Sequence, residues 1–304
     1  MDILLALVKV TLEEGFVYAV LAMGVYITYS ILDFPDLSVD GTLPFGAIIT
    51  GVLILQGWNP WLCLLVSFLG GAAAGCITGF LHVRLHIRPL LCGILVMTGL
   101  LTINLVLAKA GTGGLSIVSF TDSERIFNSG IVELLPESIG GLRCRALLLS
   151  LVLAVLCKLA LDWYLGTKSG LLLRATGNNE QYVVMLGRNP GNMKILGLAL
   201  GNGFAALAGA ILAQQNKSAS TAMGTGMVVL GLASVIIGLS LFQRVRRMRA
   251  TTKVLLGSIV YKACLAAASG LGLPTDYLKL LMAVLFVLAL VGSDLMKRQR
   301  RVRT

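Results

Sequence analysis

RATGNNEQYVVMLGRNPGNMK, residues 174–194, is the longest polar interruption in the second half of a chain that is otherwise almost entirely apolar. Its pattern predicts a loop, a short helix over Gln181 to Gly187, and a second loop. Asn178 and Asn179 are expected to cap this helix, because asparagine side-chain oxygens accept the free N–H groups of a first helical turn. The stretch therefore separates two long apolar segments by a short helix that lies outside both.

The composition of the short helix leaves two interpretations open. Glu180 lies at its start, where the helix dipole favours negative charge, and the residues at 188–191 end it. A helix this short has nothing of its own against which to bury apolar side chains, so it either docks into another protein or belongs to an ordinary cytoplasmic loop. In the docking interpretation, Arg188 lies at the rim of the contact. The side chains expected to be buried by the partner are Tyr182, Met185 and Leu186.

The rest of the chain has the composition of a membrane protein. Of its 304 residues, 57% are apolar and only 13% are charged, whereas soluble domains average about 25% charged residues. Apolar runs of roughly 17 to 25 residues, the length that crosses a bilayer, recur along the whole sequence. We expect an all-α polytopic membrane protein with one transmembrane domain over residues 1–304 and about nine spans. The expected spans are 12–32, 42–56, 61–83, 90–110, 145–165, 192–214, 224–242, 254–271 and 277–293.

The positions of the basic residues predict the orientation. Lys/Arg-rich segments at 82–88, 174–194, 243–253 and 297–303 alternate with turns that are poor in both. The positive-inside rule places the basic segments, and with them the C-terminus, in the cytoplasm and the N-terminus outside. The net charge of +11 is thus spread over loops, which argues for contact with anionic membrane lipid and against nucleic acid as a partner.

Two polar interruptions, at 33–46 and 213–226, occupy corresponding places in the two halves of the chain. Each follows a span rich in small residues and precedes a short apolar span, and the predicted orientation places them on opposite sides of the membrane. This pattern predicts an inverted repeat, with spans one to four (about 12–110) against spans six to nine (about 192–293) and the cytoplasmic loop 166–191 between them. Paired interruptions of this kind indicate a translocation path.

Polar residues in and near the interruptions are the candidates for that path, with a second interpretation for each group. The three aspartates between 33 and 40 are functional if they lie at membrane depth, and form a solvated turn with helix caps if they lie at the surface. The two asparagines inside spans also fit contacts between helices, and the set at 214–216 also fits an external loop. The candidates are Asp33, Asp36, Ser38, Asp40, Asn104, Asn202, Gln214, Gln215 and Asn216.

Several chemistries have no sequence signature in this chain. There is no GxxxxGK[ST] loop for ATP, no HExxH and no GxSxG motif. The six cysteines form no CxxC pair, and His82 and His86 have helical spacing but no carboxylate nearby to complete a metal site. We therefore expect a protein that is not an enzyme and that binds neither a metal nor a cofactor itself.

Three segments resemble one known family. FVYAVLAMGVYITYSILDFPDLSVDGTLPFGAII (16–49) resembles the N-terminal region of permease subunits of bacterial ABC importers, in the group that handles branched-chain amino acids and ribose. GNNEQYVVMLGRNPGNMKILGLALGNGFAALAGAILAQ (177–214) is similar to that group's cytoplasmic loop and Gly/Ala-rich span, and MGTGMVVLGLASVIIG (223–238) to the next segment. The resemblance extends over about residues 14–293 and looks closest to the small permeases of tryptophan-type or uncharacterised transport systems.

The resemblance implies a permease homodimer in the bacterial inner membrane, paired with separate cytoplasmic ATPase subunits that carry the ATP and with an extracytoplasmic solute-binding protein. It implies an amino acid or similar small solute as substrate, and residues 178–187 as a coupling helix that sits in a cleft of the ATPase. The alternative is a secondary transporter coupled to H⁺ or Na⁺ through Asp33, Asp36 or Asp40. The residues assigned to ATPase coupling are Asn178, Asn179, Glu180, Gln181, Tyr182, Met185, Leu186, Gly187, Arg188 and Pro190.

Overall fold

Long apolar helices make up most of the computed structural model, because a helix satisfies its backbone hydrogen bonds internally and so tolerates lipid. The structure describes residues 2–121, 123–128, 138–139, 142–143, 145–245 and 247–270, with scattered positions between 277 and 291. Within these residues, seven helices are long and apolar enough to cross a membrane, and one shorter apolar helix joins them. The all-α polytopic fold is confirmed. The ninth expected span, 277–293, lies outside the continuously described residues, so the count of nine stays a prediction.

The first half of the chain contains four long helices. Helix α1 (Asp2–Val25) continues directly into the π-helix η1 (Tyr26–Ile31), so the first span includes the N-terminal residues as well as the predicted 12–32. Helices α2 (Val39–Leu55), α3 (Pro60–Leu85) and α4 (Pro89–Thr112) follow. Both α3 and α4 begin with proline, whose missing N–H costs nothing in a first turn.

Within the described residues, the second half contains four further long helices and several short elements. Helices α5 (Arg145–Gly166), α6 (Lys168–Asn178) and α7 (Glu180–Met185) lead into α8 (Pro190–Asn216). The 3₁₀ turn η3 (Thr221–Gly224) precedes α9 (Met227–Leu241) and α10 (Ala250–Gly270). Strand β1 (Ile117–Ser119) pairs antiparallel with β4 (Ser218–Ser220), and β2 (Ser138–Ile139) pairs with β3 (Leu142–Arg143).

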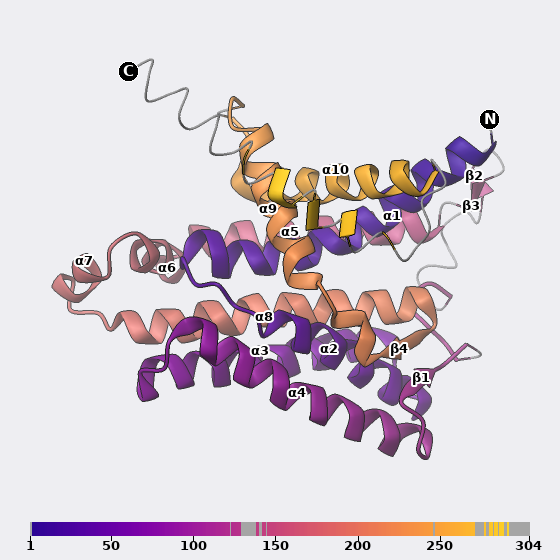
Figure 1. Ribbon diagram of the computed structural model, residues 1–304, viewed down its shortest axis with the longest axis horizontal. Helices are drawn as coiled ribbons and strands as arrows, with labels where there is room; N and C mark the ends of the chain where they lie inside the picture. The colour runs from indigo at the N-terminus through magenta and orange to yellow at the C-terminus, as the bar shows by residue number, and fades with distance from the viewer. Residues whose placement is uncertain are drawn as a thin grey trace.

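Helix α8 forms the centre of the bundle, between α1 on one side and α2 and α3 on the other (Figure 1). Its small residues allow backbones to touch. A Cβ atom at Gly46 of α2 would collide with the backbone of Ala206, and one at Gly75 of α3 with the backbone of Leu198. This close approach is the packing that small residues permit between membrane helices, where van der Waals contact replaces the hydrophobic effect.

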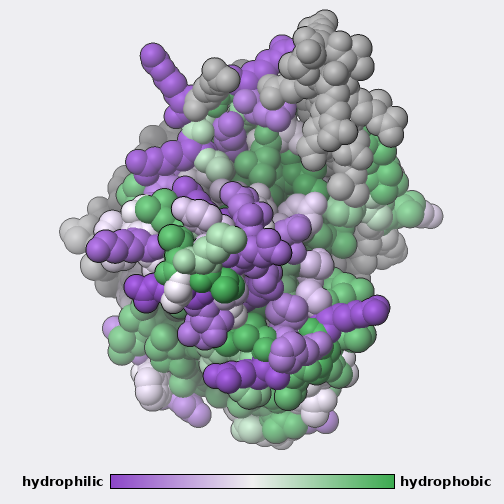
Figure 2. Space-filling view, turned by 90° about the vertical axis from the view of Figure 1, so that its left-hand side faces the viewer, coloured by the Kyte–Doolittle hydropathy of each residue, from purple (hydrophilic) through white to green (hydrophobic). Residues whose placement is uncertain are grey.

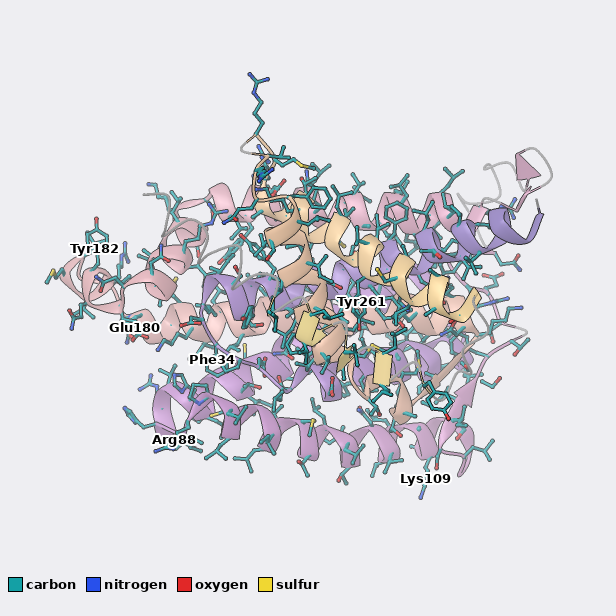
Figure 3. The ribbon with its side chains drawn as sticks, turned by 45° about the horizontal axis from the view of Figure 1, so that its top comes forward. Phe34, Arg88, Lys109, Glu180, Tyr182 and Tyr261 are labelled. Carbon is teal, nitrogen blue, oxygen red and sulfur yellow. The ribbon has the colours of Figure 1, made fainter. Side chains whose placement is uncertain are left out.

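The basic segments gather at one end of the bundle. Figure 3 places Arg88, Glu180 and Tyr182 at this end and Lys109 at the other. The Phe34 and His82 rings meet edge to face at 5.2 Å, which brings the α3–α4 connection next to the break before α2. The start of α1 lies at the opposite end (Figure 1). The basic loops thus share one end of the bundle, as the positive-inside rule requires. The absolute orientation in the membrane stays a prediction.

The end that carries α7 differs in surface character from the flanks. Viewed from this end, hydrophilic side chains gather in the middle of the face, with hydrophobic ones among them and around the rim (Figure 2). Along the flanks, α4 and α5 expose many of their leucine and valine side chains, whereas most of α8 is buried. The apolar flanks are suited to contact with lipid, and the polar end is suited to contact with water.

Candidate functional site

The break between η1 and α2 gives three aspartates three different environments. Helix α2 begins at Val39, so the irregular backbone is shorter than the predicted interruption of 33–46. Asp33 is exposed, with a left-handed φ of 53°. Asp36 is buried and Asp40 is half-buried. Neither sequence-based interpretation therefore fits all three, because one aspartate lies in a surface turn and another lies inside the bundle.

Asp36, Ser38 and Asn202 meet in one buried polar cluster. Asp36 Oδ1 accepts from Ser38 N at 2.9 Å and from Ser38 Oγ at 2.6 Å. Asp36 Oδ2 accepts from Asn202 Nδ2 at 2.7 Å. The sequence analysis missed Thr42, whose Oγ1 donates to Asn202 Oδ1 at 2.9 Å. A buried carboxylate is tolerated when donors surround it, and here the donors come from Ser38 at the start of α2 and from Asn202 of α8.

Asp40 joins the first break to the second. Its Oδ1 accepts from Val228 N at 2.8 Å and its Oδ2 from Gly226 N at 3.2 Å. The free N–H groups at the start of α9 are therefore capped by a carboxylate that comes from α2 rather than from the residue before the helix. The second break is also shorter than the predicted 213–226, because α8 continues to Asn216 and α9 begins at Met227. The two predicted interruptions thus meet directly.

A cavity of about 270 Å³ opens beside this cap, between α2, α4 and η3. Asn104 of α4 lines it and donates from Nδ2 to Gly41 O at 3.1 Å, whereas its Oδ1 is buried without a hydrogen-bond partner. Both polar groups and apolar side chains line the space. The lining comprises Asp40, Gly41, Pro44, Met97, Thr98, Leu101, Asn104, Thr221, Gly224 and Thr225.

The candidates at the end of α8 lie apart from this site. Gln214 is buried, accepts from Ile126 N at 2.9 Å and donates to Pro60 O at 3.3 Å, so it fastens the segment after β1 to the start of α3. Gln215 is half-buried, and Asn216 is exposed at the last position of α8. Asn202 and Gln214 are twelve residues apart on one helix, which is about 18 Å at 1.5 Å per residue. The structure does not bring 214–216 to the aspartates.

The predicted loop before the short helix is wrong. Residues 168–178 form helix α6, and Asn178 is its last residue. Asn179 alone separates α6 from α7, and its Oδ1 caps α7 by accepting from Tyr182 N at 3.2 Å. The short helix itself, predicted at 181–187, is present at Glu180–Met185. Of the two predicted caps, Asn179 is confirmed.

Helix α7 presents an apolar surface while one side chain anchors it. Val183 is fully buried, whereas Tyr182, Met185 and Leu186 are exposed, with Met185 at 83%. Glu180 forms an ion pair with Lys194 of α8, which ties the start of α7 to the bundle. Gln181 and Arg188 are exposed on the same segment.

The chain then turns sharply into α8. Gly187 has a left-handed φ of 69°, which glycine adopts without strain. Asn189 Oδ1 accepts from Gly191 N at 2.8 Å, and Pro190 is the first residue of α8. The turn fixes how α7 projects from the end of the bundle.

Comparisons with known proteins identify the family to which the sequence belongs. The sequence profile of the family described as branched-chain amino acid transport system / permease component matches residues 10–290. A tyrosine transport system permease protein of Clostridioides difficile is 37% identical over 284 residues, covering 93% of this chain and 90% of the relative. An uncharacterised protein of Rickettsia prowazekii is 28% identical over 287 residues, covering 92% and 95%.

A more distant relative broadens the range of transport systems. The autoinducer 2 import system permease protein of Salmonella typhimurium is 29% identical over 212 residues, covering 67% of this chain and 54% of the relative. No solved structure matches the chain. The family profile covers almost the whole helical bundle, including the two breaks and α7. The chain therefore belongs to the branched-chain amino acid transport system permease family, and is a membrane-embedded permease component of a bacterial ABC system that imports a small solute.

Proposed function

We propose that this permease carries an amino acid or a closely similar small solute, and that α7 couples its movement to ATP hydrolysis on a separate cytoplasmic ATPase. In this proposal two copies of the chain form the pathway, and a solute-binding protein delivers the substrate from outside. The N-terminus faces outward and the C-terminus faces the cytoplasm. The chain binds no cofactor of its own, because the ATP belongs to the partner.

The exposed apolar surface of α7 is the observation that carries the coupling proposal. A six-residue helix gains little stability alone, yet this one is capped by Asn179, held by Lys194 and anchored by Val183. Those contacts fix a helix whose remaining large side chains face away from its own chain. Burying one such side chain in a partner contributes roughly 1.5–3 kcal/mol. Tyr182, Met185 and Leu186 are therefore the expected hot spots.

The cavity beside Asp40 supports the substrate proposal. The Asp40 carboxylate suits a substrate ammonium group, and the hydroxyl groups of three threonines and the free Asn104 Oδ1 offer further polar contacts. Met97 and Leu101 on the same wall suit an apolar side chain. Its volume of about 270 Å³ lies just below the usual range of small-molecule sites, about 300–1,000 Å³. The relative from Clostridioides difficile, described as a tyrosine permease, points to the same class of solute.

The test of coupling compares Met185→Glu with Leu115→Glu. Both replace an exposed apolar residue, but Leu115 follows α4, which ends on the side of the bundle away from α7 (Figure 1). In the isolated permease neither side chain has packing to lose. At an interface, a buried unpaired charge costs more than 1.4 kcal/mol, so the affinity of Met185→Glu for the ATPase should fall at least about tenfold.

The measurement is co-purification of the permease with its partner ATPase, followed by substrate-stimulated ATP hydrolysis in proteoliposomes. Met185→Glu should lose both, whereas Leu115→Glu should keep both. Normal coupled hydrolysis in Met185→Glu would contradict the assignment of α7. Uptake that persists without ATP and collapses with an H⁺ or Na⁺ gradient would replace the proposal by the ion-coupled alternative at Asp33, Asp36 or Asp40.

A further inference from the structure

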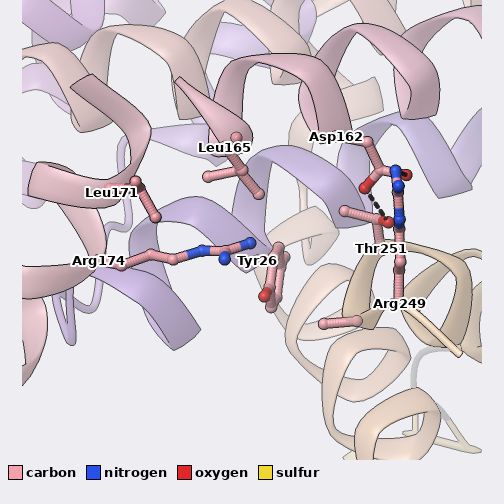
Figure 4. Close-up of a pocket in the computed structure, with 9 residues that line it drawn as sticks. Tyr26, Asp162, Leu165, Leu171, Arg174, Arg249 and Thr251 are labelled. Atoms are coloured by element: carbon pink, nitrogen blue, oxygen red, sulfur yellow. Dashed lines mark hydrogen bonds and ion pairs between the residues drawn. The ribbon is translucent and has the colours of Figure 1, made fainter. Parts of the chain in front are cut away.

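A second cavity, of about 520 Å³, opens at the basic end of the bundle, between α5, α6 and α10 (Figure 4). The end of α5 forms one wall, and Arg174 and Leu171 of α6 form another. Tyr26, at the start of η1, lines the inner side. Neither the break around Asp36 nor the exposed surface of α7 contributes a lining residue, so this cavity is separate from both features described above.

The charges around this cavity do not cancel. Its one lining carboxylate, Asp162, already pairs with Arg249 at 3.1 Å and with Lys158 at 3.2 Å, and also accepts from Thr251 Oγ1 at 2.6 Å. Within the described part of the chain, no carboxylate pairs with Arg174, whose side chain extends along the cavity toward Tyr26 (Figure 4). The cavity therefore has a net positive charge, with one guanidinium group free to bind an anion.

The flank of α5 sets the depth of the cavity relative to the bilayer. The outward face of this helix exposes Val155, Leu156 and Leu159, which is a surface for acyl chains. Trp163 follows, 76% exposed, and exposed tryptophan marks the interface between hydrocarbon and headgroups. Gly166, which lines the cavity, is three residues further, about 4.5 Å along the helix. The cavity thus opens where the apolar flank ends, at headgroup level.

We propose that this cavity binds the phosphate headgroup of an anionic phospholipid, with Arg174 as its main ligand and the acyl chains along α5. The planar guanidinium group donates two parallel hydrogen bonds to phosphate, and basic pockets between membrane helices hold anionic headgroups in this way. Arg249 contributes through its 69% exposed side chain while Asp162 holds it in place. The inference requires only that the chain spans the membrane, and so does not depend on the coupling proposal.

Bound lipid in this position would act on α7 through α6. Arg174 lies one turn before Asn178, the last residue of α6, and α7 begins two residues after that. A headgroup held between Arg174 and Arg249 would therefore link α6 to the start of α10. The position of the exposed α7 surface would then depend on the anionic lipid content of the membrane.

The test measures lipid retained by the purified full-length permease, using native mass spectrometry after reconstitution in phosphatidylglycerol or phosphatidylcholine. We expect selective retention of phosphatidylglycerol, falling about five-fold in Arg174→Gln, because one cation near an anionic surface contributes about that factor. Arg174→Lys should keep only part of the retention, since the charge remains but the two parallel hydrogen bonds of the guanidinium group are lost. Arg88→Gln is the matched control, an exposed arginine at the same end that does not line the cavity.

Three outcomes would overturn the proposal. Equal retention of phosphatidylglycerol by Arg174→Gln and the wild type would remove Arg174 as a ligand. Displacement of the retained lipid by millimolar inorganic phosphate would identify a site for soluble anions instead. Lost co-purification with the ATPase, with lipid retention unchanged, would assign Arg174 to the protein interface. Unchanged size-exclusion and thermal-unfolding profiles of Arg174→Gln establish that the variant is folded.

Discussion

Asn202 is the residue on which the buried polar contacts between the break before α2 and helix α8 converge. Its Nδ2 donates to Asp36, and its Oδ1 lies within hydrogen-bond distance of both Ser38 and Thr42. Ser38 Oγ has a single proton, yet it lies near acceptors on both Asp36 and Asn202. Thr42 therefore keeps Asn202 Oδ1 satisfied whenever Ser38 donates to the carboxylate.

Replacing Asn202 by alanine should destabilise the permease. The change removes the donor to Asp36 Oδ2 and the acceptor for Thr42, and each unsatisfied buried group costs about 1–3 kcal/mol. We expect the thermal-unfolding midpoint in detergent to fall by several degrees, since 1 kcal/mol corresponds to about 2–4 °C in a chain of this order of size. Thr42→Val, which removes one hydroxyl and keeps the shape, should cause a smaller fall. An Asn202→Ala midpoint equal to that of the wild type would show that the cluster does not stabilise the fold.

At the scale of elements, the contacts of α8 with α2 and α3 depend on positions without a Cβ atom. Gly46 faces the backbone of Ala206, and Gly209 faces the backbone of Leu43 on the same pair of helices. Side chains larger than hydrogen at these positions would push α2 away from α8. That displacement would also pull Asp36 and Asn202 apart, because Asp36 lies just before α2 and Asn202 lies on α8.

The matched pair Gly46→Ala and Gly99→Ala tests this dependence. An added Cβ at Gly46 collides with main-chain atoms that cannot move aside, and overpacking of this kind costs typically 1–3 kcal/mol. An added Cβ at Gly99 meets nothing within 4 Å, so its only effect is the better helix propensity of alanine, worth up to about 1 kcal/mol. Thermal unfolding should therefore shift down for the first variant and stay level or rise for the second. A similar downward shift in both would point to a general intolerance of alanine in these helices.

The sequence predicted the existence of the helices better than the boundaries of the polar segments. The helices α3, α4 and α8 begin within two residues of the predicted span starts at 61, 90 and 192, and each begins with a proline, which fits a first turn and few other helical positions. Gly177 falls in the predicted loop before the short helix, but it lies within α6, where a Cβ atom would collide with the backbone of Ile31. A glycine required by close packing and one required by a turn look the same in a sequence.

For the candidate site as well, the sequence identified residues but not the contacts between them. Asp36, Ser38 and Asn202 were identified as polar residues among apolar ones, and the structure places them together. Their separation by 166 positions along the chain leaves no local signal of the contact. The cap that Asp40 provides for α9 was equally hidden, since a helix start is ordinarily capped by its own preceding residues. Thr42 was missed because threonine is common in apolar helices and satisfies its hydroxyl locally.

At the scale of the whole molecule, the two ends of the bundle have different chemistry. The end with α7 carries the basic connections, including the one between α9 and α10, and the end with the start of α1 carries the turn between α2 and α3. An asymmetric distribution of Lys and Arg fixes which end faces the cytoplasm during insertion. Accessibility from each side of the membrane is therefore the direct test of the predicted orientation.

Gln56→Cys and Gln243→Cys form a matched pair for that test. Both glutamines are exposed, one in the α2–α3 turn and the other in the α9–α10 connection. In a chain whose six native cysteines are replaced by serine, a membrane-impermeant maleimide should label Gln56→Cys on intact cells. Gln243→Cys should react only after permeabilisation. The reverse labelling pattern would show that the protein has the opposite topology and that α7 lies outside the cell.

Helix α9 connects features that lie far apart. Its first turn is held by Asp40 beside the smaller cavity, and the connection after it leads to Arg249 at the rim of the larger one. At about 1.5 Å per residue, its 15 residues span roughly 22 Å, and Figure 1 shows it crossing steeply over the long helices. A continuous helix resists compression along its axis, so α9 would transmit a displacement of one of its ends to the other. A displacement of the α9–α10 connection would therefore move the first turn of α9 along the helix axis. The Asp40 carboxylate would then either move with that turn or lose its hydrogen bonds to it.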